Sequence, residues 1–215
     1  MYRLHYRLAL FACVCLAVLA TSAPAAVIRV KWDSPADGPG DDWSNAFQTV
    51  TAAMAASVAG DEIWVAGDAS HPYVENITLK DGVGLYGGFA GAEASREERD
   101  WRANFTILDG SGAGDVVTAA SGGSASTVLD GFTVRNGRRG IYSSSSSPSI
   151  TNNTISGNSQ YGIYCYSSSS PTITNNIVAF NATGIYTSRG SPVLRSNCVY
   201  RSEEHTSELQ SRQSI

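Results

Sequence analysis

The chain has 215 residues, enough for one domain with its own hydrophobic core, and a formal net charge of −4. The charge is uneven: residues 27–130 carry 6 Lys or Arg and 16 Asp or Glu, whereas residues 131–200 carry five arginines and no acidic residue. The acidic first part argues against nucleic acid as the main partner. The second part cannot by itself form a glycosidase site, because such a site needs two carboxylates.

Residues 1–25 have the pattern of a cleaved export signal. Arg3 and Arg7 precede an uncharged apolar run of 13 residues at 8–20, and Ala-Pro-Ala at 23–25 supplies the small residues of a cleavage site. The run is shorter than the roughly 20 residues that span a bilayer, so we expect no transmembrane segment. The sequence therefore predicts a secreted or cell-surface protein.

Residues 26–60 are expected to form an N-terminal segment that ends in a capping α-helix. Ser44 is placed to be the N-cap, and apolar residues follow at helical spacing until Gly60: Phe47, Val50, Met54 and Val58. A helix over 44–59 would cover the open end of the repeats that follow. Four aspartates precede it in a Gly- and Pro-rich stretch: Asp33, Asp37, Asp41 and Asp42. Their spacing is not that of an EF-hand, so we expect a solvated loop and no cofactor, with a calcium site as the alternative.

A repeat of about 22 residues dominates residues 61–200. Gly-Ile-Tyr at 140–142 recurs at 162–164 and at 184–186, and each copy continues through a serine-rich stretch to a proline. The repeat is too short for a pair of helices, and its Ser, Thr, Asn, Ile and Tyr content favours short strands and turns. A single coil cannot bury its own apolar face, so the coils must stack. Weaker copies begin near Asp61, which leaves room for roughly six coils.

Stacking the copies in register predicts columns of equivalent residues. Three apolar columns would line the interior: Ile141, Ile163 and Ile185; Ile150, Ile173 and Leu194; Ile155, Val178 and Val199. Two asparagine columns would form amide ladders from coil to coil: Asn153, Asn176 and Asn197; Asn158 and Asn181. In the same way, Ile-Leu-Asp-Gly at 107–110 is interpreted as the counterpart of Leu-Asp-Gly at 129–131, which would bring Asp109 and Asp130 close together.

Several segments resemble bacterial secreted right-handed parallel β-helix repeat proteins of the pectin-lyase-like superfamily. They are Gly-Asp-Glu-Ile-Trp-Val-Ala at 60–66, Gly-Leu-Tyr-Gly-Gly-Phe-Ala-Gly at 84–91, Arg-Asp-Trp at 99–101, Leu-Asp-Gly-Phe-Thr-Val-Arg-Asn-Gly at 129–137 and Pro-Thr-Ile-Thr-Asn-Asn at 171–176. The resemblance covers about residues 27–200 and implies an all-β, single-stranded right-handed parallel β-helix. The superfamily includes polysaccharide lyases, glycoside hydrolases, adhesins and surface proteins, and the fold does not choose among them.

The residues favour binding over catalysis. Lyases that resemble this fold use acid-bound calcium and a basic proton acceptor, but the in-register acids Asp109 and Asp130 are expected to be turn residues, so we assign no catalytic residue and no metal ligand. An outward tyrosine row alternates with the inward isoleucines and could hold polysaccharide, with arginines nearby for uronic acids or sulfates: Tyr142, Tyr164, Tyr186, Arg138, Arg139 and Arg189. A tyrosine ladder that only shields the strands is the alternative reading of the row. For the whole protein, the alternatives to a polysaccharide-binding or structural module are a lyase or hydrolase with its site in other coils, and an adhesin-like stalk that binds proteins.

Residues 201–215 depart from the repeat in mid-coil. They begin Arg-Ser-Glu-Glu-His-Thr-Ser-Glu and are similar to a translated sequencing-adapter remnant, so we expect a non-native, disordered tail. An uncapped last coil would leave open strand edges, which predicts end-to-end self-association. Cys165 and Cys198 lie one and a half repeats apart, and we expect no disulfide between them.

Overall fold

The computed structural model describes residues 25–35 and 37–200. The expected export signal, apart from Ala25, and the expected non-native tail lie outside the described residues. No helix of the described part is long and apolar enough to cross a membrane.

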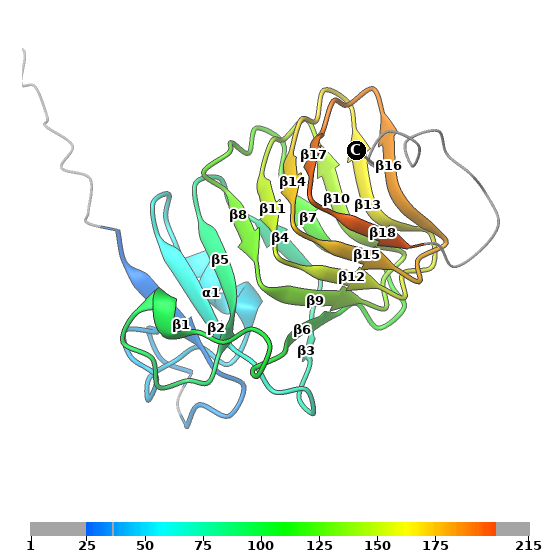
Figure 1. Cartoon of the computed structure of the whole chain (residues 1–215). Helices are drawn as coiled ribbons and strands as arrows, with labels where there is room; N and C mark the ends of the chain where they lie inside the picture. The colour runs from blue at the N-terminus through cyan, green and yellow to red at the C-terminus, as the bar shows by residue number, and fades with distance from the viewer. Residues whose placement is uncertain (1–24, 36, 201–215) are drawn as a thin grey trace, which may run out of the picture.

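The chain winds into a solenoid of about six turns of about 23 residues each (Figure 1). Every described strand pair is parallel, and most turns contribute one strand to each of three sheets. Sheet A contains β1 (Val27–Val30), β2 (Glu62–Ala66), β5 (Gly84–Phe89), β8 (Val128–Asp130), β11 (Ser149–Thr151), β14 (Thr172–Thr174) and β17 (Val193–Arg195). Sheet B contains β3 (Tyr73–Val74), β6 (Thr106–Asp109), β9 (Phe132–Arg135), β12 (Thr154–Ser156), β15 (Ile177–Ala179) and β18 (Cys198–Tyr200). Sheet C contains β4 (Ile77–Leu79), β7 (Asp115–Ala119), β10 (Arg139–Ser144), β13 (Tyr161–Tyr166) and β16 (Thr183–Ser188). The predicted all-β parallel β-helix is confirmed.

The three predicted apolar columns form the interior, one from each sheet. Ile141, Ile163 and Ile185 pair in register on sheet C. The column of Ile150 belongs to sheet A and that of Ile155 to sheet B. The first isoleucine of each column has no exposed surface: Ile141, Ile150 and Ile155. Full burial of such a side chain is worth about 1.5–3 kcal/mol, so the repeated apolar positions both set the register and stabilise the stack.

The helix at the N-terminal end is shorter than expected. α1 spans Val50–Ala56, and its N-cap is Thr49, whose side chain accepts a hydrogen bond from the Ala52 N–H at 3.2 Å. The predicted start at Ser44 was wrong, because Phe47 forms a parallel bridge with Val30 and cannot also be helical. The helix still packs against β1, β2 and β4, with Val50, Ala53 and Met54 buried, and therefore covers the core at this end.

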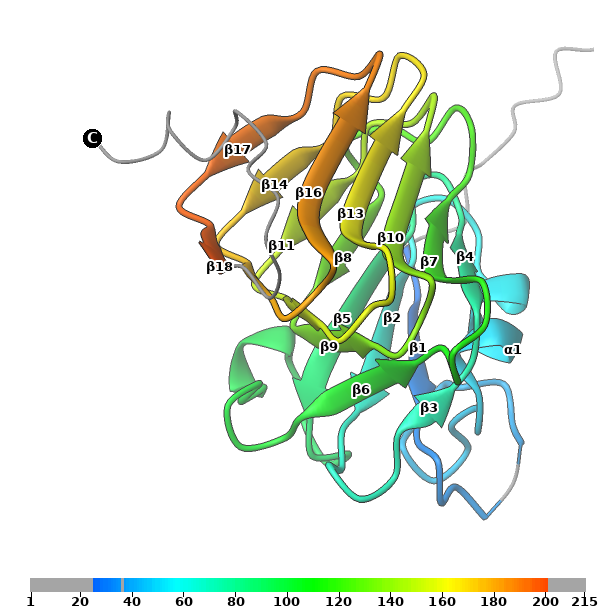
Figure 2. The same cartoon turned by 90° about the vertical axis from the view of Figure 1, so that its right-hand side faces the viewer.

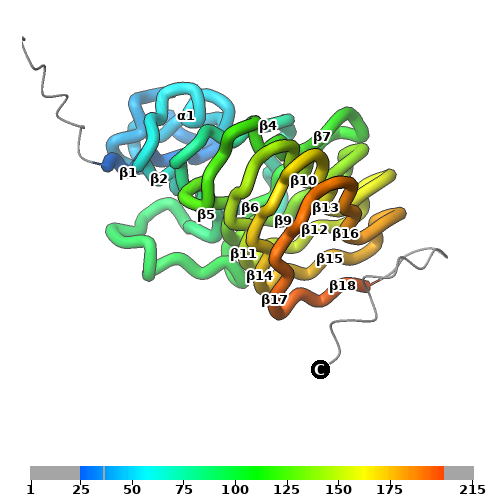
Figure 3. The backbone as a smooth tube through the Cα atoms, turned by 90° about the horizontal axis from the view of Figure 1, so that it is seen from above, coloured from blue at the N-terminus to red at the C-terminus, as the bar shows by residue number. Residues whose placement is uncertain are grey.

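The second turn is enlarged by an insertion between β5 and β6. Residues 90–105, here called the 90–105 loop, contain the 3₁₀ helix η1 (Arg96–Glu98) and stand out from the side of the solenoid (Figure 3). The insertion shifts the phase of the sequence pattern. Asp109 therefore lies on sheet B opposite Arg135, whereas Asp130 lies on sheet A opposite Thr151. The predicted stacking of these two aspartates was wrong.

Candidate functional site

The predicted tyrosine row lies on sheet C, whose strands run side by side in Figure 2. Tyr142, Tyr164 and Tyr186 pair in register on β10, β13 and β16. Their ring centroids are 5.6 Å and 5.3 Å apart, with neighbouring rings tilted by 39° and 47°. Each follows an inward isoleucine, and Tyr186 is 39% exposed. The outward row is thus present in the geometry, with its rings in contact.

Two further tyrosines widen this aromatic surface. The ring of Tyr161 lies 5.1 Å from Tyr164 and 5.0 Å from Tyr186, and the ring of Tyr166 lies 5.9 Å from Tyr164. Burial, followed by the neighbouring tyrosines, raises the pKa of the Tyr164 hydroxyl, so this ring stays neutral at physiological pH. Tyr166 could have been found from the sequence, because it lies two residues after Tyr164 on the same strand.

The arginines assigned to this surface are not equivalent. Arg139 binds both carboxylate oxygens of Asp115 at 2.5 Å, and the Arg138 Nη2 lies 3.5 Å from the same carboxylate. The Arg139 guanidinium also lies 3.7 Å from the centroid of the Tyr142 ring. Arg189 follows the other end of β16 and is exposed. The structure therefore brings Arg138 and Arg139 beside the tyrosines, around an aspartate that the sequence alone did not indicate, and keeps Arg189 apart.

Both asparagine columns are hydrogen-bonded inside the turns. Asn176 receives hydrogen bonds on its Oδ1 from the backbone N–H and the Nδ2 of Asn153, and it donates its own N–H and Nδ2 to the Oδ1 of Asn197. In the second column, Asn158 donates its N–H and its Nδ2 to the Oδ1 of Asn181. All but Asn197 are buried, so the main role of these amides is to stabilise the turns.

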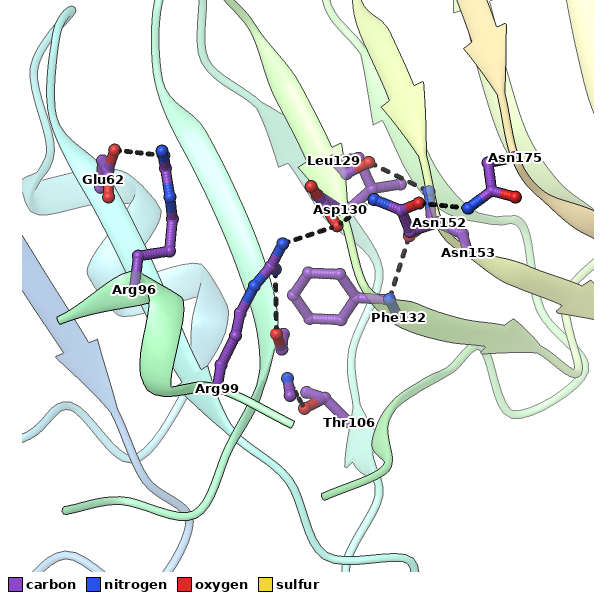
Figure 4. A network of polar contacts seen from close by, with 12 residues as sticks. Glu62, Arg96, Arg99, Thr106, Leu129, Asp130, Phe132, Asn152, Asn153 and Asn175 are labelled. Atoms are coloured by element: carbon purple, nitrogen blue, oxygen red, sulfur yellow. Dashed lines mark hydrogen bonds and ion pairs between the residues drawn. The ribbon is translucent and has the colours of Figure 1, made fainter. Parts of the chain in front are cut away.

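A second, outer chain of polar contacts was not foreseen from the sequence. The Nδ2 of Asn175 donates to the Oδ1 of Asn152 at 2.6 Å, and the Nδ2 of Asn152 donates to the Oδ1 of Asp130 at 3.0 Å. The same oxygen lies 3.1 Å from the Nη2 of Arg99, which comes from the 90–105 loop (Figure 4). Asp130 thereby joins the loop to two successive turns of the solenoid. The repeated Asn-Asn pairs were the available signal, since an inward asparagine leaves its neighbour pointing outward.

These contacts border a groove of about 300 Å³ between the loop and the solenoid. Trp101, Arg102 and Phe105 line it from the 90–105 loop. The solenoid side consists of residues from the turns between sheets A and B and from sheet B itself: Thr106, Gly131, Phe132, Thr133, Asn152, Asn153, Thr154, Asn175 and Ile177. A concave, partly apolar site with a few converging polar groups is the usual form of a ligand site.

The remaining acidic candidates serve the local structure. Burial would raise the pKa of Asp109, but hydrogen bonds from the Ser111 N–H and from Arg135 and Asn136 outweigh burial and lower it. Asp42 accepts hydrogen bonds from the backbone of the two residues that open the following turn. In the described part of the chain, no three His, Cys, Asp or Glu side chains are arranged to hold a metal ion. The calcium alternative stays an untested prediction.

Comparison with known families agrees with this architecture. The sequence model of the family described as right-handed beta helix region matches residues 103–214, just over half of the chain. The chain belongs to this family. No curated protein and no solved structure matches the β-helix protein.

Proposed function

We propose that this β-helix protein is a secreted or cell-surface module of the pectin-lyase-like superfamily that binds polysaccharide through the tyrosine row of sheet C. The continuous surface formed by five tyrosines carries the proposal. Tyrosine offers an apolar ring and a polar hydroxyl, a combination suited to a sugar ring with apolar faces and hydroxyl edges. Arg138 and Arg139 share one carboxylate, so one positive charge remains nearby for an acidic sugar.

The proposal includes no catalytic role. Asp109 and Asp130 lie in different sheets, and each is held by an arginine and an asparagine. Neither carboxylate is therefore placed beside a second acid with which it could share the work of a glycosidase. The remaining candidate is a purely structural module, which the mutual contacts of the tyrosine rings and the stacking of Arg139 on Tyr142 favour.

Retardation in native gels that contain soluble polysaccharide tests the proposal. We expect Tyr186→Ala and Tyr164→Ala to weaken retention about two- to tenfold, because an aromatic contact is worth about 0.5–1.5 kcal/mol. Tyr200→Ala is the matched control, since Tyr200 is 62% exposed on sheet B and away from the row. The proposal is contradicted if every polysaccharide that retains the wild type retains all three variants equally well. If neither neutral nor uronic-acid polymers retain the wild type, the result favours a structural module.

A further inference from the structure

The groove beside the 90–105 loop presents aromatic rings on one side and hydrogen-bonding groups on the other. Trp101 is 38% exposed and Phe105 is 49% exposed, although rings of this size are usually buried. Facing them, Thr133 and Thr154 are neighbours in register on sheet B. Within the described part of the chain, the hydroxyls of these two threonines make no hydrogen bond. They are therefore available to a ligand that lies against the rings.

The polar side of the groove repeats along the solenoid axis. Thr133 and Thr154 come from successive turns, as do Asn152 and Asn175, which are joined by a hydrogen bond of 2.6 Å. Successive strands of a sheet lie about 4.8 Å apart, so equivalent donors and acceptors recur at this interval. The side-chain oxygen of Asn175 has no donor among the described residues and extends the row. A ligand with regularly spaced hydroxyls fits this arrangement better than a compact molecule does.

The carboxylate beside the groove is already paired. The carboxylate of Asp130 is bound by Arg99 and by the amide of Asn152 (Figure 4). Of the described residues that line the groove, Arg102 alone is charged; it pairs with no carboxylate, and its guanidinium lies 4.7 Å from the centroid of the Trp101 ring. The described lining therefore offers no carboxylate to a cationic ligand, and to an anionic one it offers only this single arginine, which already packs on an indole ring. The complementary ligand is therefore neutral.

The loop holds its aromatic residues in place before a ligand arrives. Gly88 has φ +93°, and a Cβ there would lie 2.7 Å from Trp101, so only glycine lets the loop pack directly on β5. The Asp100 N–H donates to the Gly88 carbonyl at 2.9 Å, and Arg99 donates to the Gly87 carbonyl at 3.2 Å. A preformed site loses less conformational entropy on binding, which favours a ligand whose single contacts are weak.

We propose that this groove is a second binding site, and that its ligand is a neutral oligosaccharide that stacks on Trp101 and Phe105 and hydrogen-bonds to Thr133, Thr154 and Asn175. The inference does not rest on the tyrosine row, which lies on another sheet and for which we propose acidic sugars as ligands. Either site can be present without the other.

Isothermal titration with cellohexaose, xylohexaose, mannohexaose and, as the acidic comparison, hexagalacturonate tests the second site. We expect at least one neutral hexasaccharide to bind. Trp101→Ala should weaken that binding about tenfold or more, and Thr154→Val, which removes only the hydroxyl, roughly two- to tenfold. Trp32→Ala is the matched control, because Trp32 has the same 38% exposure and does not line the groove, and this variant should bind as the wild type does.

Tyr164→Ala separates this inference from the proposed function. It should weaken retention by polysaccharide and leave binding of the neutral hexasaccharide unchanged. The inference is overturned if no neutral hexasaccharide binds at millimolar concentration, or if Trp101→Ala weakens the binding of hexagalacturonate more than that of every neutral hexasaccharide. It is also overturned if Tyr164→Ala abolishes binding of the neutral hexasaccharide while Trp101→Ala does not. Circular-dichroism melts establish that each variant is folded, and Trp101→Phe, which keeps a ring, should retain part of the affinity even if Trp101→Ala fails to fold.

Discussion

Replacing Asn176 by leucine tests the asparagine ladder at its most connected position. Asn176 is 1% exposed, and its side chain bonds to both neighbouring turns. It accepts from the backbone N–H of Asn153 and donates from its Nδ2 to the carbonyl of Ile150 at 2.9 Å. Leucine has a similar size but no polar atom, so the change leaves these buried groups without a partner and keeps most of the volume.

The size of the effect follows from the groups that are left unpaired. Each buried donor or acceptor without a partner costs about 1–3 kcal/mol. Burying the additional apolar surface of leucine offsets about 1 kcal/mol. The Nδ2 of Asn153 keeps its hydrogen bond to the Leu129 carbonyl, which limits the loss. With the Asn153 N–H and the Ile150 carbonyl left unpaired, we therefore expect Asn176→Leu to lower the free energy of unfolding by about 1–5 kcal/mol.

Urea unfolding followed by circular dichroism measures this difference as a lower midpoint at an unchanged m value. Thr174→Val is the matched control, because Thr174 is a half-buried neighbour whose hydroxyl makes no hydrogen bond to any described residue. We expect it to change the free energy of unfolding by less than about 0.5 kcal/mol. An Asn176→Leu variant as stable as the wild type would refute the reasoning, because the ladder would then contribute nothing that packing does not supply.

Three further outcomes are expected. Phe180 has φ +56°, a left-handed conformation that asparagine tolerates better, and it occupies the turn position that Asn136 occupies two turns earlier. Phe180→Asn should therefore raise the midpoint of unfolding by an amount equivalent to about 0.5–1 kcal/mol. No gain would mean that the Phe180–Tyr200 contact offsets the backbone strain. Burial raises the pKa of the Cys165 thiol to about 12, whereas Cys198 is exposed. Treatment of the folded protein with iodoacetamide at about pH 8, followed by peptide mapping, should therefore show a labelled Cys198 and an unlabelled Cys165. Equal labelling of both cysteines would argue against this burial. The pKa of Asp109 is lowered on folding, so this carboxylate stabilises the protein above its unfolded pKa of 3.8, and the contribution is lost as the pH falls through the folded pKa. In urea melts from neutral pH downward, Asp109→Asn should be less stable than the wild type at neutral pH and should lose less stability on acidification. Parallel pH profiles for the variant and the wild type would contradict this.

The repeat determined most of the fold because its period and its alternation leave one consistent arrangement. A slip of one residue would turn Ile141, Ile163 and Ile185 outward, so the apolar columns fix the register before any long-range contact is known. The same argument predicted which asparagines face inward. It also predicted that the tyrosines of sheet C form an outward row, although not that Asp115 would hold Arg138 and Arg139 beside them.

Sequence reasoning failed where the period is interrupted. The 90–105 loop changes the phase between β5 and β6, so two similar Leu-Asp-Gly segments fall on different sheets. At the N-terminal end, helical spacing suggested a start at Ser44, but pairing of Phe47 with Val30 overrides that local preference. In both cases a long-range contact decided between conformations that the local sequence allows equally.

The sequence by itself determined the parallel coil, its interior columns and its buried amides, since these depend on residues that recur at a fixed interval. Only the tertiary structure decided the groove. Its aromatic side comes from the loop, its polar side from later turns of the solenoid that extend to Asn175, and the ion pair between Arg99 and Asp130 joins them. No periodic pattern links these segments, because an insertion is placed by the surface on which it folds back, and that surface exists only once the coils have stacked.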